Sequence, residues 1–298
     1  MFGSEGTLGI VTSAVVKVFP LPEAQEYGSV LFPSFEDGFQ FMYALTREAT
    51  PPASVRLVDN LQFQFGLALK PASSGLGALK SKVEKLYVTR VKGFDPHRMV
   101  ACTLVFEGTR EQVEREQRDV YRIAARYGGM KAGAENGRRG YQLTYSIAYI
   151  RDFLMNYYII AESFETSVAW SDALALCENV KRRLVEEYQR RRLPGKPFVT
   201  ARVTQVYRTG VCIYFYFGFY YKGVSDPQEV YLELENIARD EILNAGGSLS
   251  HHHGIGKLRR GFLPRIMSPA NQELKRDLKR SLDPENVFGS GNQGLSSP

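Results

Sequence analysis

The sequence is poor in cysteine and histidine, and it has no apolar run of membrane-spanning length. The three cysteines among its 298 residues are Cys102, Cys177 and Cys212. This sparse, odd-numbered set argues against a disulfide framework and favours a reducing compartment. The longest apolar run, at residues 211–221, reads "VCIYFYFGFYY", about half of the ~20 residues that a membrane-spanning helix needs. Its density of aromatic residues predicts a buried strand instead.

The chain is moderately basic. The formal net charge is +6, and such an excess suits an anionic ligand, an acidic surface or nucleic acid as a partner. The basic residues are not gathered in one tail, and the densest group, at 181–192, is typical of a solvated helix face. With 298 residues, 44% of them hydrophobic, the chain can form one large or two ordinary domains.

Two segments, 101–130 and 212–249, follow the same pattern of an apolar strand and then a helix. Each helix has a start of capping-box form and an end at paired glycines. The pattern predicts an α+β fold, in which ferredoxin-like repeated units place their helices on one face of an antiparallel sheet. The residues that mark the helix ends are Thr109 with Gln112, Ser225 with Gln228, Gly128 with Gly129, and Gly246 with Gly247.

Other stretches complete the expected order of elements. A short glycine loop at 208–210 predicts a hairpin of the strands 198–207 and 211–221. Residues 133–195 have a mostly helical pattern, broken at 162–170, and predict a helical cap inserted into the sheet domain. The remaining expected elements are a strand at Thr12–Phe19, a strand and a helix capped by Ser34 within 27–49, and a last helix at about 269–282.

Three of the four histidines, His251, His252 and His253, stand side by side in "GSLSHHHGIGKLRR" at 247–260. Side chains alternate between the two faces of a strand, so that only the first and third can share a face. The fourth histidine, His97, is far away in the sequence, and neither CxxC nor HExxH spacing is present. A polar wall that handles protons is therefore favoured over a metal site, because imidazole titrates near neutrality.

A tyrosine and two arginines are further candidates for chemistry. Tyr214 lies on the more polar face of its predicted strand; this face is either a second core layer or the wall of a ligand cavity. Arg151 stands in an otherwise apolar helix pattern, where it either forms an ion pair with Asp152 or binds an anion. Arg56 likewise either pairs with a residue such as Asp59 or has a functional role.

The segment "GSEGTLG" at 3–9 is a glycine-rich turn that leads into an alternating stretch. It lacks the GK[ST] of a phosphate-binding loop and does not match GxGxxG. Its backbone amides are nevertheless suited to hold a phosphate or the edge of a flavin.

Taken together, these segments resemble one family. "FGSEGTLGIVT", "YIRD", "CIYFYF" and "GGSLSHHHGIGKLR" occur in this order in the C-terminal half of the alkyldihydroxyacetonephosphate synthase family, flavin enzymes of the vanillyl-alcohol-oxidase type. The resemblance runs from Phe2 to about Gly294, and the stretches 56–71, 139–152 and 247–254 are typical of the synthases rather than of the wider superfamily.

The resemblance implies an FAD-dependent, redox-neutral exchange in ether-lipid synthesis. Acyl-dihydroxyacetone phosphate loses its fatty acid, and a long-chain alcohol takes its place. The cofactor supplies the difficult chemistry, and the protein supplies binding and proton transfer. The resemblance also implies a peroxisomal homodimer with a peripheral membrane contact, and no nucleic-acid partner.

The same resemblance assigns roles to individual residues. It implies that Tyr214 is a proton donor and acceptor, that the histidine run at 251–253 lies in the active site, and that Arg151 binds substrate. Arg56 matches a position that is needed for activity near the flavin, and the loop at 290–294 matches a C-terminal loop that is needed for activity. The segment that touches FAD corresponds to Glu5, Gly6, Thr7, Leu8, Gly9, Ile10 and Val11.

The family's FAD-binding half would precede the glycine turn. We therefore expect residues 1–20 to be a remnant of that domain and residues 21–298 to form the substrate and cap domain. The chain alone is then expected to be inactive and not to retain FAD. Two alternatives remain open: a catalytically inactive fragment that acts as a dimerisation partner, and a flavin-dependent alcohol or hydroxyacid oxidase.

Overall fold

The structure is a computed structural model that describes residues 2–69 and 86–295. Its centre is a seven-stranded sheet with the order β4-β1-β3-β2-β6-β7-β5, in which all neighbouring strands are antiparallel. The expected α+β fold with an antiparallel sheet is confirmed. The stretch 56–71 is described except for its last two residues.

The first half of the sheet is a ferredoxin-like unit. Its strands have the order β4-β1-β3-β2, which a βαββαβ unit produces when each helix crosses back over the same face. A short helix, α2 (Asn60–Ala68), and a π-helical turn (Tyr87–Val91) lie between β2 and β3. The elements of the unit are β1 (Ala24–Phe32), α1 (Phe35–Glu48), β2 (Ser54–Val58), β3 (Val100–Gly108), α4 (Arg110–Arg126) and β4 (Met130–Lys131).

The second half repeats this arrangement without a fourth strand. The two units join where Leu57 and Val58 of β2 pair with Val203 and Arg202 of β6. The place of the missing strand, beside the edge strand β5, is taken by the segment after α7, because Ser248 N–H donates to the carbonyl of Ser167 at 2.8 Å. The elements are β5 (Ile159–Ala169), α6 (Trp170–Arg190), β6 (Phe198–Val206), β7 (Gly210–Tyr220) and α7 (Pro227–Asn244).

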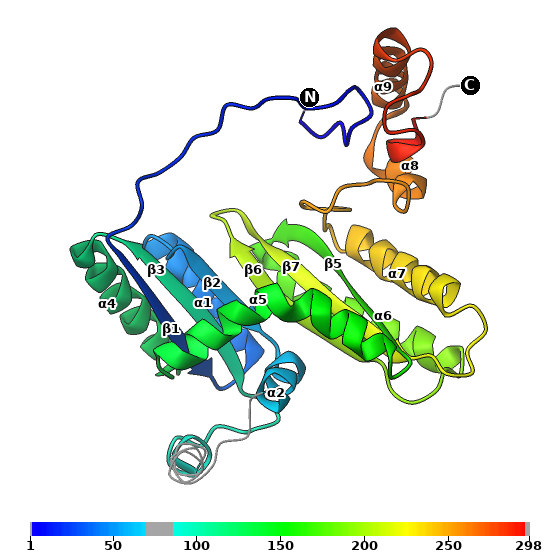
Figure 1. Cartoon of the computed structure of the whole chain (residues 1–298). Helices are drawn as coiled ribbons and strands as arrows, with labels where there is room; N and C mark the ends of the chain where they lie inside the picture. The colour runs from blue at the N-terminus through cyan, green and yellow to red at the C-terminus, as the bar shows by residue number, and fades with distance from the viewer. Residues whose placement is uncertain (1, 70–85, 296–298) are drawn as a thin grey trace.

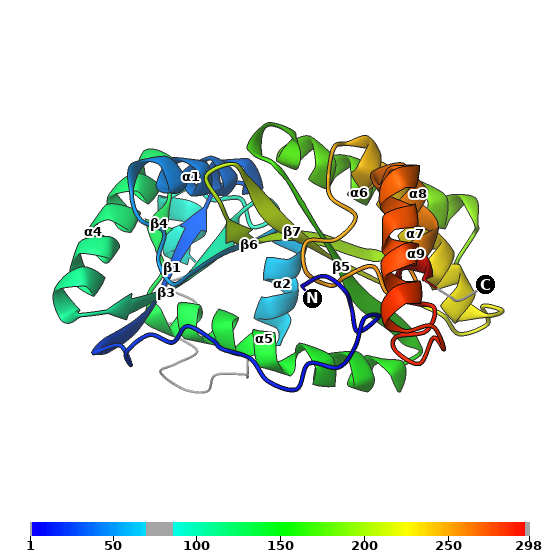
Figure 2. The same cartoon turned by 90° about the horizontal axis from the view of Figure 1, so that it is seen from above.

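Helices cover both faces of the sheet: the helices of the repeated units share one face, as expected, and a helix from the region 133–195 lies on the other. Helices α1 and α6 lie on one side, and α5 (Ala134–Met155) crosses the other side (Figures 1 and 2). We call the side that α5 crosses the inner face. A Cβ at Gly137 would lie 2.1 Å from the carbonyl oxygen of Gly28, and one at Gly140 would lie 2.5 Å from Thr103. Glycine therefore permits the close approach of α5 to β1 and β3.

The apolar core lies between the sheet and the helices opposite α5. Along β7, Ile213, Phe215, Phe217 and Phe219 are buried in this core, while Tyr214 and Tyr216 point to the inner face and are only partly buried. The alternation of side chains that was seen in the sequence thus separates the residues of β7 that face the core from those on the inner face. The helix side of the core includes Leu176, Leu184, Leu234 and Ile242.

The region 133–195 is not wholly helical. It contains the two long helices α5 and α6, but the supposed break between them is β5, which pairs with β7 along its full length from Ile159 to Ala169. Phe164, Thr166 and Val168 of β5 are buried on the core side. The polar residues between them, among them a fully buried Glu165, hid the strand pattern from sequence reasoning.

Most of the expected helix ends are confirmed. Thr109 forms a capping box with Gln112, and the Ser34 side chain accepts a hydrogen bond from Asp37 N–H. The start of α7 was placed wrongly: its N-cap is Asp226, followed by Pro227, which is well suited to the first turn.

Residues 10–22 run as an extended segment with no strand partner in the described part of the chain, so that the strand expected at Thr12–Phe19 is not found. This segment connects β1 to the glycine turn, which lies beside the C-terminal elements and away from the sheet (Figure 1). Those elements are α8 (Leu263–Ile266), the expected last helix α9 (Pro269–Leu282), and 3-10 turns at Arg260–Phe262 and Asn292–Gly294. Among the described helices, none combines the length and the apolar character that crossing a bilayer requires.

Candidate active site

The three histidines lie on a loop that is held by one buried carboxylate. Glu165 of β5 is completely buried and accepts hydrogen bonds from Ser250 Oγ at 2.6 Å and from the backbone N–H groups of His251, His252 and His253 at 2.6, 3.2 and 2.9 Å. A carboxylate can accept about four such bonds, so that its capacity is used by the loop. The missing fourth strand is thus replaced by a loop in which three consecutive amide groups point to one acceptor.

The electrostatics of Glu165 follow from these bonds. Burial raises the pKa of its carboxyl group, but the hydrogen bonds from Ser250 and from the three backbone amides outweigh burial and lower the pKa to about 2. The buried guanidinium of Arg239 donates to the backbone oxygens of Glu165 and Leu249 at 3.0 and 2.6 Å, and it pairs with Glu235. The loop is therefore bound to β5 in two ways, through the carboxylate of Glu165 and through Arg239, which connects the two backbones.

The low pKa of Glu165 predicts an acid-sensitive stability. A carboxyl group whose pKa is lowered from 4.5 to about 2 on folding stabilises the fold above pH 4.5, and this contribution is lost as the pH falls towards 2. The lost free energy of unfolding should be about 3 kcal/mol, at about 1.36 kcal/mol per pKa unit. Urea denaturation at several pH values should show this loss, and the Glu165→Gln variant should lack it. If the unfolding free energy depended on pH equally in both proteins, Glu165 would not be the source of the acid sensitivity.

Tyr214 of β7 faces the histidines. It is paired in the sheet with Glu165 on one side and Arg202 on the other. Its hydroxyl is hydrogen bonded to His252 Nε2 and lies 3.2 Å from His253 Nε2. Desolvation raises the pKa of the Tyr214 hydroxyl to about 12, and desolvation also lowers the pKa of His253. At neutral pH the site therefore presents a protonated phenol beside a neutral imidazole, which is an arrangement suited to proton transfer.

The hydrogen bonds continue beyond Tyr214. The Nδ1 atoms of His251 and His252 are 2.8 Å apart, and His251 Nε2 lies 2.9 Å from the hydroxyl of Tyr207. The side chain of Tyr207 is 44% exposed. A continuous row of hydrogen-bonded groups thus runs from the inner face to the surface.

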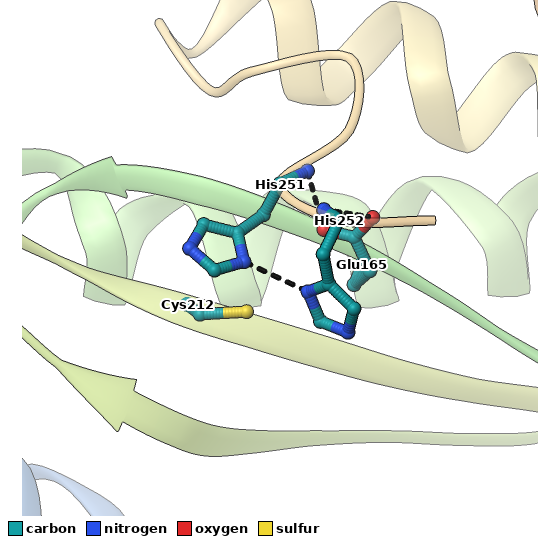
Figure 3. A group of neighbouring side chains, drawn as sticks. All are labelled: Glu165, Cys212, His251 and His252. Carbon is teal, nitrogen blue, oxygen red and sulfur yellow. Dashed lines mark hydrogen bonds between the residues drawn. The ribbon is translucent and has the colours of Figure 1, made fainter. Parts of the chain in front are cut away.

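The side chains of Glu165, Cys212, His251 and His252 come close enough together to be considered as metal ligands. One potential ligand atom from each lies within 4.8 Å of the others, and Figure 3 shows the four residues around one point. The carboxylate, however, already accepts four hydrogen bonds from the loop, and burial raises the pKa of the Cys212 thiol to about 11. The donor set is thus better suited to holding protons than to holding a metal.

Arg202 of β6 extends the site along the inner face. Its guanidinium carbon lies 5.0 Å from the ring centroid of Tyr214 and 4.8 Å from that of Tyr216, within the range of cation–π attraction. Burial is the main cause that lowers the pKa of Arg202, and the nearby Arg56 also contributes. Arg56 itself lies over the ring of Tyr141 in α5 at 5.3 Å. Two arginine side chains therefore lie on the inner face on the side of Tyr214 that is opposite to Glu165.

The ion pair that was considered between Arg56 and Asp59 is not formed. Asp59 instead caps α2, accepts from Ala201 N–H at 2.9 Å, and pairs with Lys181 at 2.7 Å. These three partners hold α2 against β6 and leave Arg56 beside α5.

Arg151 occupies a different place. It is about half exposed on α5, and it forms ion pairs with Asp152 at 3.1 Å and with Glu162 at 3.0 Å. The structure therefore shows the ion pair that was considered for this residue and does not join Arg151 to the histidine cluster by a hydrogen bond. Its role in substrate binding stays a prediction.

The glycine turn contacts the segment that follows the histidines. The carboxylate of Glu5 accepts hydrogen bonds from the N–H groups of Ile255 and Gly256, both at 2.6 Å. Gly3 and Gly6 have positive φ angles of 76° and 74°, and no atom lies within 4 Å of the place where a Cβ would stand. Open space beside the backbone allows a flat ring to approach it, so that the turn fits the flavin contact expected from the sequence.

The C-terminal loop at 290–294 holds the other side of this turn. Asn292 Nδ2 donates to the carbonyl of Glu5 at 3.0 Å, and Gln293 Nε2 donates to that of Gly3 at 2.6 Å. The buried Lys279 of α9 donates to the carbonyl of Thr7 at 2.9 Å. Three segments that are far apart in the sequence, the turn, the histidine loop and the C-terminal loop, are thus built into one assembly.

Sequence reasoning missed three residues of this site. Glu165 was hidden in what looked like a break between helices, and Arg202 was passed over although it is a charge in the middle of an apolar strand pattern. Such a charge was a usable signal. Tyr207 gave no signal, because it lies at the end of a strand beside the hairpin loop and its contact with His251 depends on the fold.

Comparison with known proteins relates the chain to one family. Residues 21–292 match the family described as FAD linked oxidases, C-terminal domain. The chain is 45% identical over 293 residues to the alkyldihydroxyacetonephosphate synthase of Caenorhabditis elegans, covering 98% of the chain and 49% of that protein. It is 31% identical over 299 residues to the synthase of Trypanosoma brucei brucei, covering 99% of the chain and 48% of that protein.

A solved structure of an alkyldihydroxyacetonephosphate synthase superposes with a TM-score of 0.74 at 27% identity, covering 96% of the chain and 48% of the solved chain. The resemblance seen in the sequence is thereby confirmed. The chain spans about half the length of the curated relatives that it matches.

Proposed function

Because the chain belongs to the family of FAD-linked oxidase C-terminal domains, we propose that it is the part of an alkyldihydroxyacetonephosphate synthase that binds substrate and transfers protons. The proposed reaction exchanges the acyl chain of acyl-dihydroxyacetone phosphate for a long-chain alcohol and releases a fatty acid. The observation that carries the proposal is the position of the Tyr214 hydroxyl between His252 and His253. The loop that holds these two histidines continues to residues whose N–H groups donate to Glu5 of the glycine turn.

FAD is the proposed cofactor, and when bound it supplies the reactive centre for the exchange at the substrate carbon. The residues that would contact it are Glu5, Gly6, Thr7, Leu8, Gly9, Ile10 and Val11. Because the carboxylate of Glu5 and the C-terminal loop hold the turn against the histidine loop, the flavin contact and the proton-transfer groups would keep a constant separation. Such constancy of position accounts for a large part of the catalytic effect of an active site.

The chain's own residues would then bind substrate and move protons. Tyr214 would accept or donate the proton of the reacting alcohol, with His252 and His253 as its partners. The basic inner face, with Arg56 and Arg202, would attract the phosphorylated substrate. Arg151 would leave one of its carboxylate partners and bind the phosphate of the substrate instead.

The function can be tested in an enzyme in which this chain replaces the 293-residue stretch that it matches in the Caenorhabditis elegans synthase; we call it the reconstituted enzyme. A synthase should keep the visible absorbance of oxidised flavin when a long-chain alcohol is added without oxygen. An alcohol or hydroxyacid oxidase would lose this absorbance on adding its substrate. A reconstituted enzyme that holds no flavin would favour the alternative of an inactive partner.

A substitution of Arg151 tests its proposed role. In the reconstituted enzyme, Arg151→Lys should lower kcat/KM for acyl-dihydroxyacetone phosphate by about 10- to 100-fold, because hydrogen bonds to a charged group contribute about 1.5–3 kcal/mol and lysine lacks the planar fork of arginine. Stability should change by less than about 1 kcal/mol, as for other exposed ion pairs. Arg138→Lys is the control, since Arg138 lies on the same helix and is ion-paired with Glu135 at the surface. An unchanged kcat/KM would leave Arg151 as a structural residue.

Location and assembly are part of the proposal. The family resemblance supports a peroxisomal homodimer that touches a membrane surface and has no nucleic-acid partner. The proposed membrane contact is supported by large side chains that are exposed on α5 and just after it: Tyr145, Tyr149, Phe153, Met155, Tyr157 and Tyr158. Aromatic side chains with a polar end are well suited to the boundary between water and lipid.

A further inference from the structure

We propose that Tyr207 is the outer end of a proton path that connects Tyr214 with solvent through His252 and His251. The inference rests on the proposed function and adds to it a route for the proton that the exchange releases. The path consists of three consecutive contacts: Tyr214 to His252, His252 to His251 at 2.8 Å, and His251 to Tyr207 at 2.9 Å. Each contact joins two groups that can both donate and accept a proton.

The hydrogen bonds of the path can all point outward. In this state the Tyr214 hydroxyl donates to His252 Nε2, and the Nδ1–H of His252 donates to Nδ1 of His251. The Nε2–H of His251 then donates to the oxygen of Tyr207. The Tyr207 hydroxyl finds an acceptor in Gln205 Oε1 at 3.2 Å. No group of the path is left without a partner in this state.

The same groups can also be bonded in the opposite direction. The Tyr207 hydroxyl then donates to His251 Nε2, His251 Nδ1–H donates to His252, and His252 Nε2–H donates to the oxygen of Tyr214. The Tyr214 hydroxyl turns to His253 Nε2, which lies 3.2 Å away. His253 therefore gives the inner end of the path a second acceptor. Because both directions are fully bonded with the same heavy-atom positions, a proton can pass along the path without a change of fold.

The chemistry of the exchange requires that a proton leave. At the substrate carbon the bond to the acyl oxygen breaks with its electron pair, and a bond to the alcohol oxygen forms. The alcohol loses its proton to Tyr214 or its partners, and the fatty acid leaves with both of its oxygens as a carboxylate, which is ionised at neutral pH. No electrons are gained or lost overall, and one proton is left for each turnover.

The outer end of the path is open to water. Tyr207 is 44% exposed, and together with His251 it borders an open surface hollow of about 440 Å³. Glu165 holds the backbone of the loop on its opposite side, so that the imidazole rings of His251 and His252 remain directed towards the two tyrosines. The exposed end gives the proton a way to solvent even when substrate covers the inner face.

The structure of the path can be tested by nitrogen NMR of histidine in the 298-residue chain at neutral pH. In either direction of the path, one of His251 and His252 carries its proton on Nδ1 and the other on Nε2. Tyr207→Phe should shift the ring resonances of His252, because the two side chains are connected through His251. Tyr220→Phe is the control, because Tyr220 is similarly exposed, at 41%. Finding both histidines protonated on Nε2 would exclude the path.

The use of the path is tested in the reconstituted enzyme. In weak buffer, Tyr207→Phe should lower turnover about tenfold, less than the ~10²–10⁴ expected for a direct acid or base. Added imidazole should restore the rate, because it can carry the proton from His251 to solvent. The Tyr220→Phe control should behave as the unchanged enzyme. If the unchanged enzyme forms ether while Tyr207→Phe is equally active at every buffer concentration, the path is wrong and the synthase function stands; if no ether forms at all, the synthase function itself fails.

Discussion

Replacing Tyr214 by phenylalanine should lower turnover of the reconstituted enzyme by about 100- to 10,000-fold, the usual contribution of a positioned acid or base. The substitution removes the hydroxyl that lies between His252 and His253. It keeps the ring, which is in contact with both imidazoles and with the guanidinium of Arg202. The unfolding free energy should therefore fall by only about 1 kcal/mol, the scale of one hydrogen bond.

Turnover and melting temperature should be measured on the same preparation of the Tyr214→Phe variant. His252→Ala and His253→Ala should lower turnover in the same way, since both are partners of the hydroxyl. Tyr216→Phe is a suitable control, because Tyr216 lies on the same face of β7 and also contacts Arg202, but no hydrogen bond joins it to the histidines. A Tyr214→Phe variant that is destabilised but fully active would remove this residue from the mechanism.

Replacing Glu165 by glutamine should affect both stability and activity. The amide keeps one acceptor oxygen, which can take the three bonds of Oε1, and it places an NH₂ group against the N–H of His251, so that one hydrogen bond is lost and three no longer go to a charged acceptor. With about 1.5 kcal/mol for the lost bond and about 0.5 kcal/mol for each weakened one, the loss is about 3 kcal/mol. Turnover should fall about 100-fold, because a displacement of about 1 Å in a catalytic group has effects of this size.

Glu107→Gln is the matched control for this substitution. Glu107 is also a strand residue, but it is exposed and accepts from Gln25 at the surface, so that its replacement should change stability by less than about 0.5 kcal/mol. Urea denaturation, turnover and the NMR signals of the three histidines would be compared in both variants. Histidine signals that remain unchanged in the Glu165→Gln variant would show that the carboxylate does not position the loop.

The fold could be predicted where the period of the sequence was clear. The alternation of Ile213, Phe215 and Phe217 with tyrosines gave a strand with two different faces, and the cap at Thr109 gave the start of α4. The strand β5 was missed because polar residues alternate with its core-facing residues, and one of these polar residues is a buried charge on the inner face. The burial of Glu165 is compensated by donors that lie about 85 residues further along the chain, and no local pattern contains that information.

The candidate site was predictable in its parts but not in its connections. The histidine run and Tyr214 were recognised from the sequence and lie in contact in the structure. The role of Glu5 as the link between the glycine turn and the histidine loop was not predictable, since the contact joins residues about 250 positions apart. Arg151 was expected near the substrate, and in the structure its guanidinium is paired with Glu162, a partner that sequence spacing did not suggest.

The most direct measurement of the proposed function follows the oxygen atom of the long-chain alcohol. The reconstituted enzyme would be given acyl-dihydroxyacetone phosphate and an alcohol that carries isotopically labelled oxygen, and the products would be analysed by mass spectrometry. The proposed exchange predicts an ether product that contains the label and a fatty acid that does not. Oxidation of the alcohol, or release of fatty acid without any labelled ether, would contradict the proposal.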